Sequence, residues 1–120
     1  MRNLPIIIPL SVILLICLSV TSAYATVVHK IRIDGIINPV SSQFIIDAIV
    51  RAEEEHAEAL IVELDTPGGL LEATRDIVQE FLATDVPIIV YVSPSGARAG
   101  SAGVFITLAA HIAVMAPGTN

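Results

Sequence analysis

Cysteine is almost absent from this chain of 120 residues, because the only one is Cys17. It lies inside an apolar run near the N-terminus and follows Ile16 rather than a small residue, which argues against a lipid-attachment site. If that run is removed, the remaining chain contains no thiol. Disulfide bonds, a thiolate nucleophile and cysteine metal sites are then excluded together.

Basic residues are also scarce. Counted from Thr26, five lysine and arginine residues stand against twelve acidic ones, which gives a formal charge of −7. We expect no nucleic acid partner, because phosphate binding requires a basic face. The acidic stretch Glu53 to Glu58 is predicted to be the solvated end of a helix rather than a metal cluster. No metal and no cofactor are expected.

The first two dozen residues have the composition of an export signal. Arg2 is followed by an almost uninterrupted apolar run from Ile6 to Val20, and then by the small-x-small triplet Ala23-Tyr24-Ala25. These are the three parts of a secretory signal, with cleavage expected after Ala25. An uncleaved anchor is the alternative, but a spanning helix needs about 20 apolar residues, and Pro5 and Pro9 interrupt the start of this run.

Short apolar segments and amphipathic segments alternate along the rest of the chain. Strands are predicted at residues 27–33, 59–64, 88–92 and 112–115. Helices are predicted at residues 44–52, with starting residues between 38 and 42, and at 70–83 and 100–110. The second and third strands are nearly all apolar, as expected for strands buried on both faces of a parallel sheet.

This alternation predicts an α/β fold built from β-α-β units, whose crossovers are nearly always right-handed. The length allows one domain of about one hundred residues after the signal. The chain ends at Pro117-Gly118-Thr119-Asn120, a turn directly after a strand, where this type of fold should continue with another helix. We therefore expect a signal peptide at residues 1–25 and the first part of a longer domain at residues 26–120.

Two glycine-rich turns follow predicted buried strands, at the edge where open α/β sheets place their ligands. The first is Thr66-Pro67-Gly68-Gly69, directly before a predicted helix. Paired glycines let the main chain approach a substrate closely, and free N–H groups at a helix start can hold an oxyanion. Taken alone, this turn is equally consistent with a tight connection that has no function.

In the second turn, the hydroxyl of Ser101 lies between Gly100 and Ala102, which are too small to cover it. A helix N-terminus favours developing negative charge, and the Ala102 N–H would point to the same place. A serine N-cap is the alternative interpretation. Because acyl transfer needs a nucleophile and oxyanion donors on one carbonyl, the two turns together favour Ser101 as nucleophile. Gly68 and Gly100 are the candidate substrate-binding residues.

Ser101 also needs a general base, and none of the nearby candidates fits. His111 stands ten residues after Ser101, and a helix between them would separate the two by roughly 15 Å. His29 and Lys30 lie on the first predicted strand, and His56 lies in the acidic helix end. All four are interpreted as structural or solvated residues, so the base is expected beyond Asn120.

The turn Asp65 to Gly69, the strand residues 89–92 and the run from Pro94 to Gly103 resemble the NfeD-like membrane proteases, also called stomatin operon partner proteases. The glycine pair is shared by all Clp-type and crotonase-fold proteins. The run Gly-Ala-Arg-Ala-x-Ser-Ala-Gly is far more specific. The resemblance covers the whole segment that follows the signal.

The resemblance implies a Clp/crotonase-like spiral of β-α-β units and a serine endopeptidase in which Ser101 attacks the peptide carbonyl. It assigns the oxyanion donors to the N–H groups of Gly69 and Ala102, and the base to a lysine downstream of Asn120. It also implies continuation into membrane segments, assembly into homo-oligomers, and apolar segments of stomatin-like membrane proteins as substrates. The export signal predicts a location at the extracytoplasmic face.

Two other functions stay open on the sequence alone. The chain could be a binding or scaffold protein of the same fold whose catalytic site is inactive. It could also be a crotonase-type acyl-CoA enzyme, which would use paired oxyanion N–H groups as well. The export signal and the exposed serine count against that second alternative, because such enzymes usually work in the cytoplasm and have no use for the hydroxyl.

Overall fold

The computed structural model describes residues 25–120, so nearly all of the predicted signal peptide lies outside the described residues. The elements are β1 (Val28–Asp34), α2 (Pro39–Glu54), β2 (Ala59–Asp65), α3 (Leu71–Ala83), β3 (Ile88–Val92), α4 (Ala102–Ala109) and β4 (Ile112–Met115). Each corresponds to a predicted element, with differences of a few residues at the ends. None of the helices formed by residues 25–120 combines the length and apolar character that crossing a bilayer requires.

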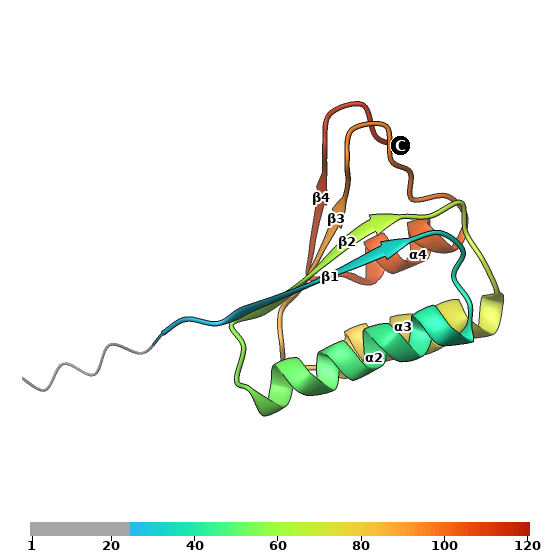
Figure 1. Ribbon diagram of the computed structural model, residues 1–120. Helices are drawn as coiled ribbons and strands as arrows, with labels where there is room; N and C mark the ends of the chain where they lie inside the picture. The colour runs from blue at the N-terminus through green and yellow to red at the C-terminus, as the bar shows by residue number, and fades with distance from the viewer. Residues whose placement is uncertain (1–24) are drawn as a thin grey trace, which may run out of the picture.

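The strands form one parallel sheet in the order β1-β2-β3-β4 (Figure 1). Asp34 pairs with Asp65 at the ends of β1 and β2, and Leu64 pairs with Val92 at the ends of β2 and β3. All the carboxyl ends therefore lie at the same edge of the sheet. Both glycine-rich turns leave the sheet from this edge.

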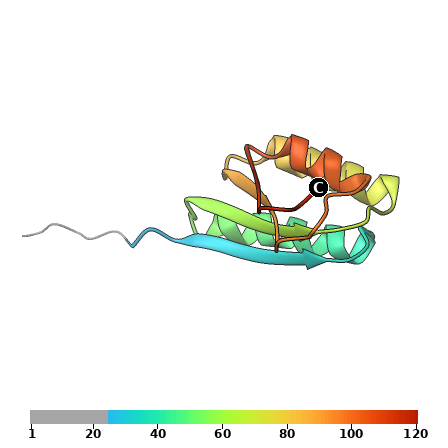
Figure 2. The same cartoon turned by 90° about the horizontal axis from the view of Figure 1, so that it is seen from above.

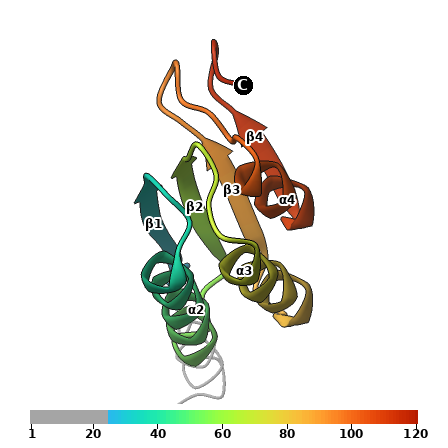
Figure 3. The same ribbon diagram turned by 90° about the vertical axis from the view of Figure 1, so that its right-hand side faces the viewer.

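The helices α2, α3 and α4 of residues 25–120 cover the same face of the sheet (Figure 3). This follows from the strand order, because right-handed crossovers between successive neighbouring strands always pass on one side. Leu60, Val62 and Leu64 of β2 are fully buried on that side, whereas Ile61 and Glu63 face the other way and are half-buried. The prediction that these strands are buried on both faces is therefore wrong for residues 25–120.

Helix α2 begins earlier than its apolar spacing indicates, because Asn38 caps it. The Asn38 side-chain oxygen accepts the N–H groups of Val40 and Ser41 at 2.9 and 3.0 Å. In return, the Asn38 N–H donates to the Ser41 hydroxyl at 2.9 Å. This reciprocal capping box, with Pro39 in the first turn, stabilises a helix start by about 1 kcal/mol.

Main-chain pairing continues past the ends of the strands. Ile37 pairs with Gly69, and Thr66 pairs with Ala99. Ala99 in turn donates its N–H to the carbonyl of Asn120 at 2.7 Å, so the C-terminal turn lies beside the loop that leads into α4 (Figure 2). These pairings hold the two glycine-rich turns together at the carboxyl edge.

A first prediction concerns the packing of α3 against the sheet. Phe81 is fully buried, while its neighbour Leu82 is 73% exposed. Phe81→Ala should lower the free energy of unfolding of the full-length protein by about 3–5 kcal/mol, because it leaves a cavity. Leu82→Ala should change it by less than about 0.5 kcal/mol. Urea denaturation measures both, and equal effects would contradict the assigned faces of α3.

A second prediction concerns the pairing of Gly69 with Ile37. A Cβ at Gly69 would overlap with the Ile37 carbonyl oxygen, whereas a Cβ at Gly96 would meet nothing within 4 Å. Gly69→Ala should therefore cost about 3 kcal/mol or more of folding stability, since backbone must move to accommodate it.

Gly96→Ala is the matched control, because its loss of folding stability comes only from backbone strain and not from a steric clash. Gly96 has φ +88°, a backbone conformation that costs an alanine about 1–2 kcal/mol. Urea denaturation of both variants of the full-length protein gives the comparison. A Gly69→Ala variant as stable as the wild type would show that the two segments do not pair.

Candidate active site

The two glycine-rich turns meet at Gly68 and Ser101. A Cβ placed on Gly68 would lie 2.7 Å from the Ser101 Cβ and 3.2 Å from its Oγ. Gly68 also has φ +123°, a conformation that residues with a side chain rarely adopt. No other residue could therefore bring the first turn this close to Ser101. The prediction that the two turns lie together is confirmed.

Ser101 is solvent-exposed and occupies the N-cap position of α4. Its side chain makes no capping hydrogen bond, so the alternative of a simple N-cap serine is not supported. Its backbone has φ 49° and ψ −107°, outside the usual conformations of residues with a side chain. Strained backbone of this kind occurs most often at functional sites.

Thr66 is the residue that holds both turns in place, and it is fully buried. Its N–H donates to the Arg98 carbonyl at 2.8 Å, and its carbonyl accepts the Gly100 N–H at 2.9 Å. Its hydroxyl accepts the Gly68 N–H at 3.1 Å. Its methyl group lies 2.8 Å from where a Cβ on Gly103 would be, which explains a glycine there. The main chain of Thr66 therefore links the two turns to each other, while its side chain contacts Gly68 and Gly103.

In the sequence, Thr66 stands out only as a member of the glycine-rich turn. The available signal was a hydroxyl residue directly after a buried apolar strand, where it needs a hydrogen-bond partner. Ile37 was also missed. No spacing in the sequence indicates that it lies beside Gly69.

The main-chain N–H groups of Gly69 and Ala102 are among those near Ser101 that have no backbone acceptor within residues 25–120. Ile37 bonds to the Gly68 carbonyl and to the Leu70 N–H, each at 2.9 Å. In a parallel pairing of this pattern, the Gly69 N–H faces away from Ile37. Ala102 is the first residue of α4, where N–H groups have no partner within the helix.

Gly68 and Gly100 have their main-chain polar groups occupied within the chain. The Gly68 carbonyl accepts the Ile37 N–H, and its own N–H is bound by Thr66. Gly100 donates its N–H to Thr66 and accepts the N–H of Gly103 at 2.9 Å. Neither glycine has an N–H left for a ligand. Their role in substrate binding stays a prediction.

None of three candidate bases faces Ser101 in the described part of the chain. The His111 Nδ1 accepts the Ile88 N–H at 3.1 Å, at the amino end of β3 and thus at the opposite edge of the sheet. The His29 Nε2 lies 2.9 Å from a Glu55 carboxylate oxygen. Lys30 pairs with Glu63 at 3.3 Å. These contacts agree with the interpretation of the three as structural or solvated residues.

Residues 27–120 match the family described as NfeD1b, N-terminal domain. The chain is 42% identical over 111 residues to the membrane-bound protease PH1510 of Pyrococcus horikoshii. That alignment covers 92% of this chain and 25% of the relative, so the chain spans about a quarter of the length of this curated relative.

Among the solved structures similar to the described residues, three illustrate the range of sequence identity. A serine-to-alanine mutant of the stomatin-specific membrane protease 1510-N has a TM-score of 0.78 and 42% identity, over 80% of this chain and 46% of that one. A lysine-to-alanine mutant of the same protease, in complex with a substrate peptide, has a TM-score of 0.76 and 44% identity, over 78% and 43%.

The third is a mutant of ClpP1 from Listeria monocytogenes, with a TM-score of 0.69 and 22% identity, over 76% of this chain and 53% of that one. At this identity the likeness shows the fold alone. The chain thus belongs to the NfeD1b N-terminal domain family and has an α/β fold of the Clp protease type.

Proposed function

We propose that residues 26–120 are the first part of a Clp-type protease domain, the part that carries the nucleophile Ser101 and the oxyanion hole. One observation carries the proposal. The exposed hydroxyl of Ser101 is not used as a helix cap, sits on strained backbone, and contacts the glycine-rich turn that follows the neighbouring strand. A serine with a purely structural role would not be expected to meet all three conditions at once.

In the proposed reaction, the Ser101 Oγ attacks the carbonyl carbon of the scissile peptide bond while a general base takes its proton. The carbonyl oxygen becomes negatively charged in the tetrahedral intermediate. The N–H groups of Gly69 and Ala102, which have no backbone acceptor of their own, are suited to stabilise that charge. The base then protonates the leaving amine, and water hydrolyses the acyl-enzyme.

A lysine downstream of Asn120 is the proposed base. Lys30, the only lysine in this sequence, pairs with Glu63 on the sheet. The similar protease 1510-N has been studied as a serine-to-alanine mutant and as a lysine-to-alanine mutant, the latter with a substrate peptide. Both facts support a Ser-Lys dyad whose lysine is contributed from outside residues 25–120.

The proposed substrate is an apolar segment of a membrane-associated protein such as a stomatin homologue. Its support is that similar proteases are described as membrane-bound and stomatin-specific. We further propose export by the signal at residues 1–25, action at the extracytoplasmic face, and membrane association through parts outside residues 26–120. Assembly into homo-oligomers is part of the same proposal. This hydrolysis requires no cofactor.

Ser101→Ala in the full-length protein tests the proposal. Cleavage of an apolar peptide should fall by about 10⁴-fold or more, because the nucleophile is removed. Ser95→Ala is the control, since Ser95 lies in the same loop but donates its hydroxyl to the Pro117 carbonyl at 2.6 Å. A fluorophosphonate probe should label the wild type and Ser95→Ala, but not Ser101→Ala. Unchanged cleavage by Ser101→Ala would contradict Ser101 as the nucleophile, whereas a wild type that cleaves nothing would favour the inactive scaffold.

A further inference from the structure

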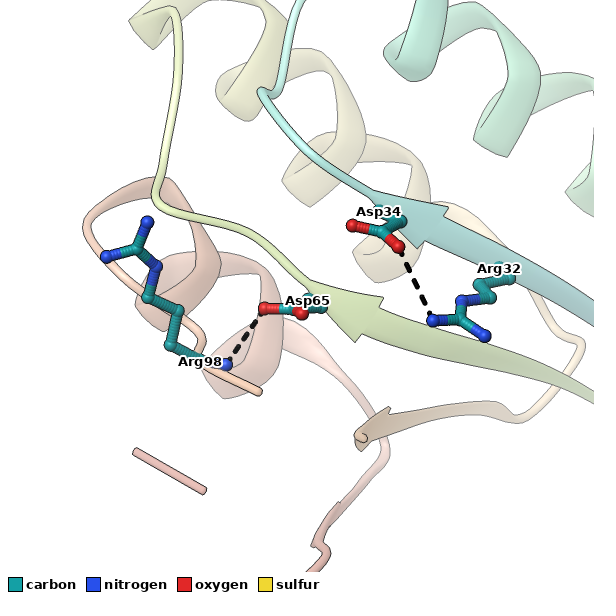
Figure 4. Close-up of polar contacts among 4 residues, drawn as sticks. All are labelled: Arg32, Asp34, Asp65 and Arg98. Carbon is teal, nitrogen blue, oxygen red and sulfur yellow. Dashed lines mark hydrogen bonds and ion pairs between the residues drawn. The ribbon is translucent and has the colours of Figure 1, made fainter. Parts of the chain in front are cut away.

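Asp65, the last residue of β2, lies beside the loop that leads to Ser101 (Figure 4). Its Oδ1 accepts the main-chain N–H of Arg98 at 3.0 Å. Arg98 stands three residues before Ser101, and its carbonyl accepts the Thr66 N–H at 2.8 Å. The amide and the carbonyl of Arg98 are therefore both fixed by adjacent residues of the first turn.

The hydrogen bond from Asp65 acts where regular structure is lacking. β3 ends at Val92 and α4 begins at Ala102, so Arg98 lies outside both elements, and its carbonyl bond to Thr66 leaves its N–H to be held by Asp65. A carboxylate is a stronger acceptor than a neutral carbonyl. The guanidinium of Arg98 points away from the carboxylate (Figure 4). Asp65 thus fixes the main chain of this residue rather than its charge.

A second carboxylate at the same edge shows that proximity alone does not produce this contact. Asp34 pairs in register with Asp65 across β1 and β2. Both line a depression of about 430 Å³ together with Arg98. The Asp34 carboxylate, however, accepts from the Arg32 Nη2 at 3.4 Å and is not bonded to the loop. Asp65 therefore binds the main chain of the loop, whereas Asp34 binds the side chain of Arg32.

We propose that Asp65 is a positioning residue for the nucleophile: its carboxylate fixes the Arg98 amide and thereby the direction in which the Ser101 hydroxyl faces the oxyanion N–H groups. This proposal rests on the proposed function. It concerns the geometry of attack rather than peptide binding. Loss of the hydrogen bond should therefore lower kcat more than it changes KM.

The test compares Asp65→Ala, Asp65→Asn and Asp34→Ala with the wild type, all as full-length protein. Asp65→Ala should lower kcat and the rate of fluorophosphonate labelling by about 10- to 100-fold, because a displacement near 1 Å costs about that much. KM should stay within about threefold. Asp65→Asn should retain most of the rate, since its amide oxygen is an acceptor in the same place. Asp34→Ala should match the wild type.

Saturating labelling separates positioning from stability. If Asp65 only stabilises the fold, Asp65→Ala will lower the fraction of protein that can be labelled, and the labelled fraction will react at the wild-type rate. That result overturns the inference, as does an Asp65→Asn variant as slow as Asp65→Ala. If the wild type is not labelled at Ser101, the proposed function fails and this inference fails with it. Labelling of the wild type with an unaffected Asp65→Ala overturns the inference alone.

Discussion

Main-chain pairing beyond the ends of the strands is the interaction on which the rest of this site depends. Thr66 bonds to both Arg98 and Gly100, and Ile37 bonds on either side of Gly69. These pairings extend the order of the parallel sheet into segments that would otherwise be independent loops. The two turns continue the parallel pairing of the sheet, so their relative position is set by hydrogen-bond geometry rather than by side-chain packing.

This close pairing explains how strained backbone can persist at Ser101. A conformation of this kind costs on the order of 1–3 kcal/mol and survives only where its surroundings determine it. Gly100, on one side, is bonded to Thr66, and the Ser101 carbonyl itself accepts the Val104 N–H at 3.0 Å in the first turn of α4. The chain is held on both sides of Ser101. Its hydroxyl can therefore remain exposed and free of a capping role.

The helices and strands, and the proximity of the two glycine-rich turns, could be predicted from the sequence. The former depend on local residue patterns, and the latter follows from the parallel order of the strands. The sequence was insufficient where the deciding contact joins residues far apart in the chain. Asp65 and Arg98 are separated by 33 positions, and nothing in the spacing distinguishes Asp65 from Asp34. Apolar strands likewise predicted two buried faces, although a pattern of side chains does not specify what covers them. Right-handed crossovers placed every described helix on one face.

The arrangement also separates the parts of the proposed reaction along the chain. Residues 65–103, from the end of β2 into the first turn of α4, contain the proposed nucleophile and both proposed oxyanion N–H groups. The main-chain hydrogen bonds that join these segments are all made among the described residues. Gly68 approaches Ser101 on one side and α4 begins on the other. The proposed base, contributed from outside residues 25–120, would then need only to bring one side chain to the exposed Ser101.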